Sequence, residues 1–229
     1  MHRVAAMSSI RVLGACPDCP ACRLSVFTAI LGAPQSACAF DVASIEARAQ
    51  VPAGWSERYA FGMVRRGVLI RQRAEAGRAT AVDAAGPGCV FPIEAEPSSD
   101  YAATDLLVCL MPKATYERAI ETEPSFARDL LAMQQAALAR VERITHARGA
   151  PTVRERVASL LCVLADTLTP PRRRERLPSG LQQRDLARLL GVRHETFCRI
   201  LGDLEREGAI RRDTDGIAIV DRDGLERAA

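Results

Sequence analysis

The chain has 229 residues, of which 48% are hydrophobic and 26% are charged. This balance is ordinary for a globular protein of one or two domains and excludes a disordered or fibrous chain. The formal net charge is only +3, so bulk charge gives no argument for nucleic-acid binding, and such a function must come from the local placement of side chains.

No segment is predicted to cross a membrane or to direct secretion. The longest uncharged run, Leu24 to Phe40, is interrupted by Gly32-Ala33-Pro34 and is too short to span a bilayer. Arg11 lies inside what would have to be the apolar part of a signal peptide. We therefore expect a cytoplasmic protein. In a reducing compartment its eight cysteines indicate metal ligands, redox thiols or core residues rather than disulfides.

The N-terminal segment, residues 1–50, is rich in cysteine. Cys16, Cys19 and Cys22 lie within seven residues, separated by prolines that discourage a helix. Such a cluster favours a metal or iron–sulfur site over core packing. Cys38 follows in a looser context and can join this set.

Residues 51–123 are predicted to form a small antiparallel β-roll. Short apolar alternations are punctuated by glycines over Val51–Pro112. Arg65-Arg66-Gly67 predicts a hairpin-like turn, and Thr80–Val82 and Leu106–Met111 predict further strands. Cys109 lies in the last of these, where it can also be a buried small hydrophobic residue.

Residues 124–148 show the longest helical pattern. Leu130, Gln134, Ala137, Val141 and Ile144 alternate in steps of four and three. This is the spacing of a coiled-coil seam, and equally of an amphipathic helix that packs on the roll. Gly149-Ala150-Pro151 ends the helix, and Val153–Leu168 predicts another helix that opens a C-terminal domain over residues 152–229.

Two short helices separated by Gly191 follow within Leu181–Glu207. In the second, Phe197, Ile200, Leu201 and Leu204 form an apolar stripe that must be buried. Glu195 and Arg199 point away from that stripe, one helical turn apart. Arginine matches the acceptors of guanine in the major groove, and glutamate accepts from the cytosine amino group; a surface ion pair is the alternative.

A hairpin is predicted after these helices. Ala209-Ile210-Arg211 and Ile217–Val220 alternate around Asp213-Thr214-Asp215-Gly216, a turn that ends in glycine. Two helices followed by a hairpin make a winged helix-turn-helix. The predicted fold class is therefore α+β, with an antiparallel β-roll, a long helix and a C-terminal winged helix-turn-helix.

The segment from Gly191 to Gly208 resembles the recognition helix of CRP/FNR-type bacterial regulators, which has the form G-x-x-x-E-T-x-x-R-x-L. The resemblance implies a sensory roll like that of the cyclic-nucleotide-binding domains, a dimerisation helix and a winged helix, in the order already predicted. It implies that Glu195 and Arg199 read one half of an inverted repeat. Thr196 would contact phosphate, and His194 would lie beside the bases.

Two positions depart from the family pattern. The FNR-like branch usually has serine where this chain has Cys198, which leaves the base contact of that position open and places a thiol near DNA. Arg193 stands where relatives often have a serine or threonine N-cap, and losing such a cap costs about 1 kcal/mol.

The resemblance also bears on the signal. The CRP branch clamps the cyclic-nucleotide phosphate with arginine, and Ala79–Glu117 contains none, so we expect no cAMP site. The FNR branch holds a [4Fe–4S] cluster on three N-terminal cysteines and a fourth at the end of the roll. Cys109 matches the context of that fourth ligand. The N-terminal spacing differs from the FNR pattern, so the remaining ligands come from Cys16, Cys19, Cys22 and Cys38.

The sequence therefore predicts a homodimeric, non-enzymatic transcription regulator that binds inverted-repeat double-stranded DNA, contacts RNA polymerase and senses oxygen or redox state through an iron–sulfur cluster. Zinc bound by the same thiols, a thiol switch at Cys198, or heme are alternatives. Another is a metal-binding protein whose helix-turn-helix makes only protein contacts. Cys89 and Cys162 are expected to be core residues.

Overall fold

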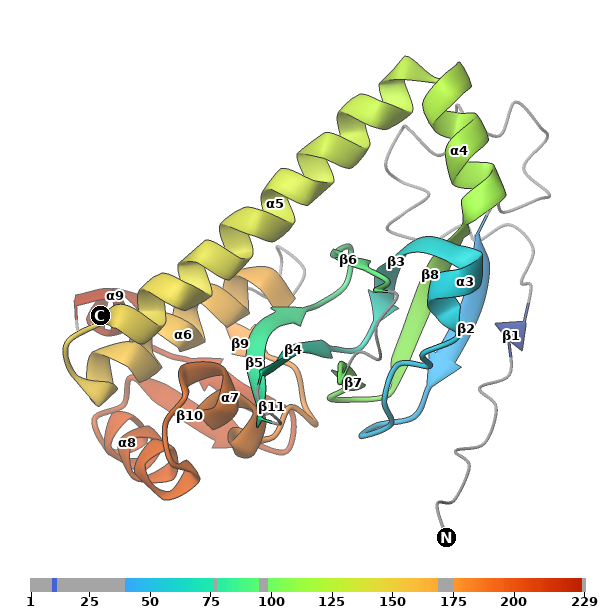
Figure 1. The fold of residues 1–229 in the computed structure, drawn as a ribbon. Coiled ribbons are helices and arrows are strands. Elements are labelled where there is room, and N and C mark those ends of the chain that lie inside the picture. Colours follow the sequence, from blue (N-terminus) through green and yellow to red (C-terminus); the bar gives the residue numbers. More distant parts are fainter. Residues whose placement is uncertain (1–9, 12–39, 76–77, 95–98, 169–174, 228–229) are drawn as a thin grey trace, which may run out of the picture.

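The computed structural model describes residues 10–11, 40–75, 78–94, 99–168 and 175–227. In Figure 1 the strands of the N-terminal half form a roll on one side of the molecule. A long helix runs along that roll, and a helical domain lies at the far end of the helix. Within the described residues, no helix combines the length and apolarity needed to cross a bilayer.

Two antiparallel sheets form the roll. The larger has the strand order β1-β2-β8-β3-β6, and the smaller has the order β5-β4-β7. Their strands are β1 (Ile10–Arg11), β2 (Asp41–Ile45), β3 (Tyr59–Arg66), β4 (Leu69–Glu75), β5 (Arg78–Ala85), β6 (Val90–Pro92), β7 (Tyr101–Ala102) and β8 (Leu106–Pro112), with the short helix α3 (Trp55–Arg58) before β3.

The central strand β8 shows why this sequence forms a two-sided sheet. It pairs with β2 on one side and β3 on the other, so nearly all of its side chains are buried. Val108 and Leu110 point into the interior of the roll. Cys109 and Met111 point to the opposite face, into a cluster with Phe126 of the long helix.

The turn at Arg65-Arg66-Gly67 is present, but the hairpin predicted there is wrong. β3 and β4 flank the turn without pairing, because β3 joins the larger sheet and β4 the smaller one. Gly67 has φ +89, and a Cβ atom there would lie 2.2 Å from the carbonyl oxygen of Asp105. The glycine therefore permits a sharp passage between sheets. The actual hairpin of this region joins β4 to β5.

Helix α4 (Lys113–Thr122) leads into α5 (Pro124–Gly149), which spans the molecule (Figure 1). The structure corrects the predicted seam on α5. Leu130 and Ala137 pack against the cluster that contains Cys109, and Ile144 is fully buried. Leu130, Ala137 and Ile144 of the predicted seam thus face the chain's own core, as the alternative interpretation held, whereas Gln134 is exposed and Val141 is half-buried. Beside it, Leu131 and Leu138 are 59% and 60% exposed.

The C-terminal part contains α6 (Val153–Leu168), β9 (Arg176–Leu177), α7 (Gln183–Leu190), α8 (His194–Arg206), β10 (Ile210–Asp213), β11 (Gly216–Ile219) and α9 (Arg222–Arg227). β10 and β11 form the predicted hairpin around Thr214-Asp215. β9 adds a third strand that the sequence did not indicate. The core of this part is continuous with Val68, Ile70 and Ala81 of the roll.

Candidate DNA-binding interface

Helix α7 is the first helix of the helix-turn-helix. The backbone N–H of Gln182, at its N-cap, donates to Asp185 Oδ2 at 3.2 Å, which satisfies one of the amides that a helix start leaves open. At the other end Gly191 has φ +68, the left-handed conformation that glycine adopts most readily. These two devices fix the length of α7 and the tight turn after it.

Helix α8 follows after a short connection and is the candidate recognition helix. Phe197, Leu201 and Leu204 are fully buried and Ile200 is 7% exposed, which confirms the predicted stripe. Arg193 is the N-cap, and its side chain makes no capping bond. The uncapped start expected from the sequence is therefore present.

The opposite side of α8 is open to solvent. His194, Glu195 and Arg199 are exposed, whereas Thr196 and Cys198 are half-buried. We call His194, Glu195 and Arg199 the outer face of α8. This face presents a carboxylate acceptor and a guanidinium donor one turn apart, near the helix N-terminus, as readout of base edges in a major groove requires.

Cys198 is oriented within the helix-turn-helix. Its thiol donates to Gln183 Oε1 of α7 at 2.9 Å, and its Sγ lies 3.3 Å from His194 Nε2. The three side chains form a polar chain across the N-terminal ends of α7 and α8. The sequence had marked Cys198 and His194 but not Gln183, whose role depends on the angle between the two helices.

The wing is held by ion pairs. Arg176 on β9 donates two hydrogen bonds to the carboxylate of Asp213, at 2.5 and 2.9 Å, and these bonds lower the pKa of Asp213. Arg212 on β10 donates to Glu205 of α8. The arginines of the wing are thus committed to carboxylates of their own domain.

Of the five cysteines predicted as metal ligands, Cys109 alone lies among the residues that the structure describes. Cys16, Cys19, Cys22 and Cys38 lie outside the described residues. Cys109 is 2% exposed, and its Cα partners are Val42 of β2 and Met63 of β3. No group of three or more histidine, cysteine or acidic side chains suited to a metal occurs among the residues the structure describes.

The two remaining described cysteines differ. Cys162 is 7% exposed in the core, as predicted, and burial raises the pKa of its thiol. Cys89 is half-buried and packs at the edge of the roll interior.

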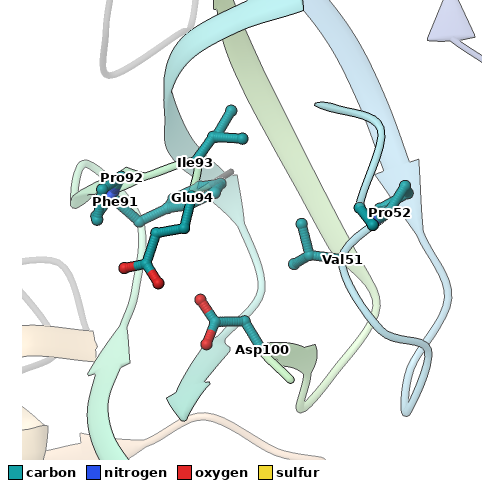
Figure 2. A pocket seen from close by; sticks show the side chains of 8 residues that line it. Val51, Pro52, Phe91, Pro92, Ile93, Glu94 and Asp100 are labelled. Carbon is teal, nitrogen blue, oxygen red and sulfur yellow. The ribbon is translucent and has the colours of Figure 1, made fainter. Parts of the chain in front are cut away.

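A small pocket opens on the roll and is lined by Val51, Pro52, Ala53, Phe91, Pro92, Ile93, Glu94 and Asp100. Figure 2 shows the carboxylates of Glu94 and Asp100 pointing toward one another. Arg71 donates hydrogen bonds to Glu94 Oε1 at 3.1 Å and to Asp100 Oδ2 at 3.4 Å. The polar groups of this pocket therefore form an internal ion-pair network with two carboxylates, a lining that disfavours a phosphate.

Known proteins share parts of this sequence and this architecture. Residues 155–228 match the Crp-like helix-turn-helix domain. Over 132 residues the chain is 33% identical to a probable transcriptional activator of Rhizobium leguminosarum bv. viciae, covering 55% of this chain and 53% of that protein. Over 116 residues it is 31% identical to the transcriptional activator protein FnrL of Cereibacter sphaeroides, covering 48% of this chain and 46% of that protein. The chain thus spans about half the length of the curated relatives it matches.

Among solved structures, FixK2 of Bradyrhizobium japonicum superposes with a TM-score of 0.68 at 24% identity, covering 82% of this chain and 96% of that one. The predicted resemblance to the CRP/FNR type is therefore confirmed. The chain has the α+β fold of these proteins, and its C-terminal part is a Crp-like helix-turn-helix domain.

Proposed function

We propose that this chain is a homodimeric transcription regulator that binds inverted-repeat DNA through α8. The observation that carries the proposal is the exposure of Glu195 and Arg199 on the outer face of α8, opposite a fully buried stripe. His194 lies on the same face, and the half-buried Thr196 would contact phosphate. Similarity to two transcriptional activators supports this role, and RNA polymerase is the partner that such a regulator would contact.

Dimerisation is assigned to the exposed side of α5. Leu131, Gln134, Leu138 and Val141 follow one another at steps of three and four, and the two leucines are more than half exposed. This is coiled-coil spacing over about three turns beside the face that packs on the roll. A partner helix covering this stripe would place two copies of α8 on one duplex, which a two-fold symmetric site requires.

The signal is assigned to a [4Fe–4S] cluster held by Cys109 and three of Cys16, Cys19, Cys22 and Cys38. Cys109 fits a ligand position because its side chain lies in an apolar cluster with Phe40, Val42 and Phe126, a setting from which water is excluded. Cys38 is four residues before Val42, the Cα partner of Cys109. When bound, such a cluster supplies sensitivity to oxygen.

A thiol switch is the second candidate, and the contact of Cys198 with His194 and Gln183 favours it. Peroxide would oxidise the Cys198 thiol to a sulfenic acid with release of water. This would replace the thiol donor between α7 and α8 at the DNA-facing surface. Peroxide should then weaken DNA binding of the native protein and leave the Cys198→Ser variant unaffected; equal loss in both would exclude this candidate.

Selection of bound duplexes from a random-sequence pool tests the proposed function. The expected result, with protein prepared under anaerobic conditions, is enrichment of an inverted repeat. Exposure of the same preparation to air should weaken binding to the selected site. Failure to enrich any sequence would contradict the proposal and favour a helix-turn-helix that makes only protein contacts.

A further inference from the structure

Asp185 is a fully buried carboxylate in the first turn of α7, at the start of the helix-turn-helix. Burying a carboxylate is costly unless hydrogen-bond donors surround it. Besides the N–H of Gln182, its two donors come from the roll. Tyr101 Oη donates to Oδ1, and Arg48 Nη1 donates to Oδ2, each at 2.7 Å. Apart from the N–H at its own helix start, the hydrogen-bond donors to the Asp185 carboxylate thus come from the roll.

The two donors are held side by side by the roll's own backbone. The N–H of Arg48 donates to the carbonyl of Ala102 at 2.7 Å, and the N–H of Ala102 donates to the carbonyl of Ala49 at 2.9 Å. Arg48 has φ +75, a left-handed conformation that costs a non-glycine residue free energy and that surrounding contacts must stabilise. Its Nη2 also donates to the carbonyl of Gly180, at 3.2 Å.

The far end of α7 is fixed to the same body. Arg148, near the C-terminus of α5, donates to the carbonyl of Leu189 on α7 and to the carbonyl of Ala81 on β5. Both ends of α7 are therefore anchored to the roll or to the long helix. Because α7 packs against α8, these anchors also fix the direction in which the outer face of α8 points.

Arg48 lies three residues beyond Ile45, the last residue of β2. At its other end, β2 begins next to the cysteine-bearing segment, and Val42 within it is the Cα partner of Cys109. The five-residue strand β2 thus lies in the sequence between Cys38 and Arg48, the residue that holds the helix-turn-helix. A displacement of β2 along or across β8 would move Arg48 relative to Asp185.

We propose that Arg48 and Tyr101 of the roll form an interdomain latch on Asp185, and that this latch couples β2 to the orientation of the recognition helix. The latch residues are positioning residues, because they touch neither DNA nor a cofactor. Closed, the latch holds the two α8 helices of a dimer at one spacing. Open, each helix-turn-helix keeps its fold and its affinity for a single half-site but loses paired binding. The DNA-binding part of this inference rests on the proposed function.

Hydrogen exchange of the full-length protein tests the latch without DNA. Tyr101→Phe removes the phenol donor, and Arg48→Gln replaces the charged guanidinium with a shorter, neutral amide. Both variants leave the helix-turn-helix sequence intact. A hydrogen bond to a charged group contributes enough to change an equilibrium by roughly tenfold or more, so we expect amides of α7 to exchange roughly tenfold faster in either variant.

Two matched controls separate the latch from general loosening of the roll. Tyr59→Phe removes a hydroxyl that donates to Asp41 at 2.8 Å within the roll, and Arg73→Gln removes an arginine paired with Glu94. Both controls should leave α7 exchange at the wild-type rate. Exchange in α7 that is unchanged in Tyr101→Phe and Arg48→Gln, or raised equally by the controls, would overturn the latch.

Binding to two duplexes tests the coupling. One duplex carries both half-sites of the selected repeat, and the other carries a single half-site. The latch variants should lose roughly tenfold in affinity for the first and bind the second like wild type. Equal loss on both, or no loss on either, would overturn the coupling. Wild type that binds neither duplex would refute the proposed function instead, while the exchange experiment would still decide the latch.

Discussion

Arg140 on α5 donates two hydrogen bonds of 2.8 Å to the carboxylate of Asp83 on β5. The side chains are only 6% and 1% exposed. This bidentate pair joins the long helix to the smaller sheet, next to the attachment of α7. Removing one partner of such a pair leaves the other charge buried and unpaired, which is strongly destabilising.

We therefore expect Asp83→Ala to lower the free energy of unfolding by about 3–5 kcal/mol, measured by denaturant unfolding. Asp166→Ala is the control. Asp166 pairs with Arg143 and Arg222 at the surface, where ion pairs contribute about 1 kcal/mol or less. A cost for Asp83→Ala no larger than that of Asp166→Ala would contradict the structural role of the buried pair.

The second prediction concerns the exposed stripe of α5. Leu138→Glu places a charge in the centre of the proposed dimer seam and should shift the protein to monomers in sedimentation measurements. Ala136→Glu adds the same charge to the same helix, at an exposed position roughly opposite Leu138 around the helix, and should leave the dimer intact. Dimers that survive Leu138→Glu, or are lost equally in Ala136→Glu, would place the interface elsewhere.

The third prediction concerns base recognition. Arg199→Ala should cost about 1–3 kcal/mol per half-site and relax the preference for one base pair. Arg143→Ala removes the same charge from α5, where Arg143 pairs with Asp166 of α6, and should change affinity little. If both variants lose equal affinity with unchanged base preference, Arg199 contributes general charge and does not read a base.

The fourth prediction follows from the latch tyrosine. Burial is the largest cause that raises the pKa of Tyr101 from 10 to about 12, and the hydrogen bond that its hydroxyl donates to Asp185 is the next. Between these values the folded chain keeps the phenol proton and the unfolded chain releases it. The resulting stability is present in full below pH 10 and is lost as pH rises toward 12.

Denaturant unfolding across that window, on wild type and Tyr101→Phe, checks this sign. Tyr59, whose pKa is also raised, is present in both proteins, so its contribution cancels. The free energy of unfolding should fall more steeply with pH in wild type than in Tyr101→Phe. Parallel curves would show that the Tyr101 hydroxyl is not held by Asp185.

Local sequence patterns predicted where helices and strands form better than they predicted which elements these pair with or pack against. The stripe of Phe197, Leu201 and Leu204 fixes α8 because helical periodicity and burial report the same face. The Asp-Thr-Asp-Gly turn fixes the wing hairpin in the same way. Arg65-Arg66-Gly67 correctly indicates a turn, but no local signal tells whether the flanking strands pair or enter different sheets.

The long helix shows the same limit. Two stripes at heptad spacing, one through Leu130 and one through Leu131, overlap along α5 and share Gln134 and Val141. Only packing on the roll decides which side is buried within the chain. Asp185 was missed altogether. Its donors Tyr101 and Arg48 lie 84 and 137 residues away in the sequence, and an acid near a helix start is common without any such partner.

Iron and acid-labile sulfide analysis of the anaerobically purified protein tests the central claim most directly. We expect brown protein with about four iron atoms and four sulfides per chain, as a [4Fe–4S] cluster requires, and loss of both in Cys109→Ser. Colourless protein that contains stoichiometric zinc and no iron would contradict it.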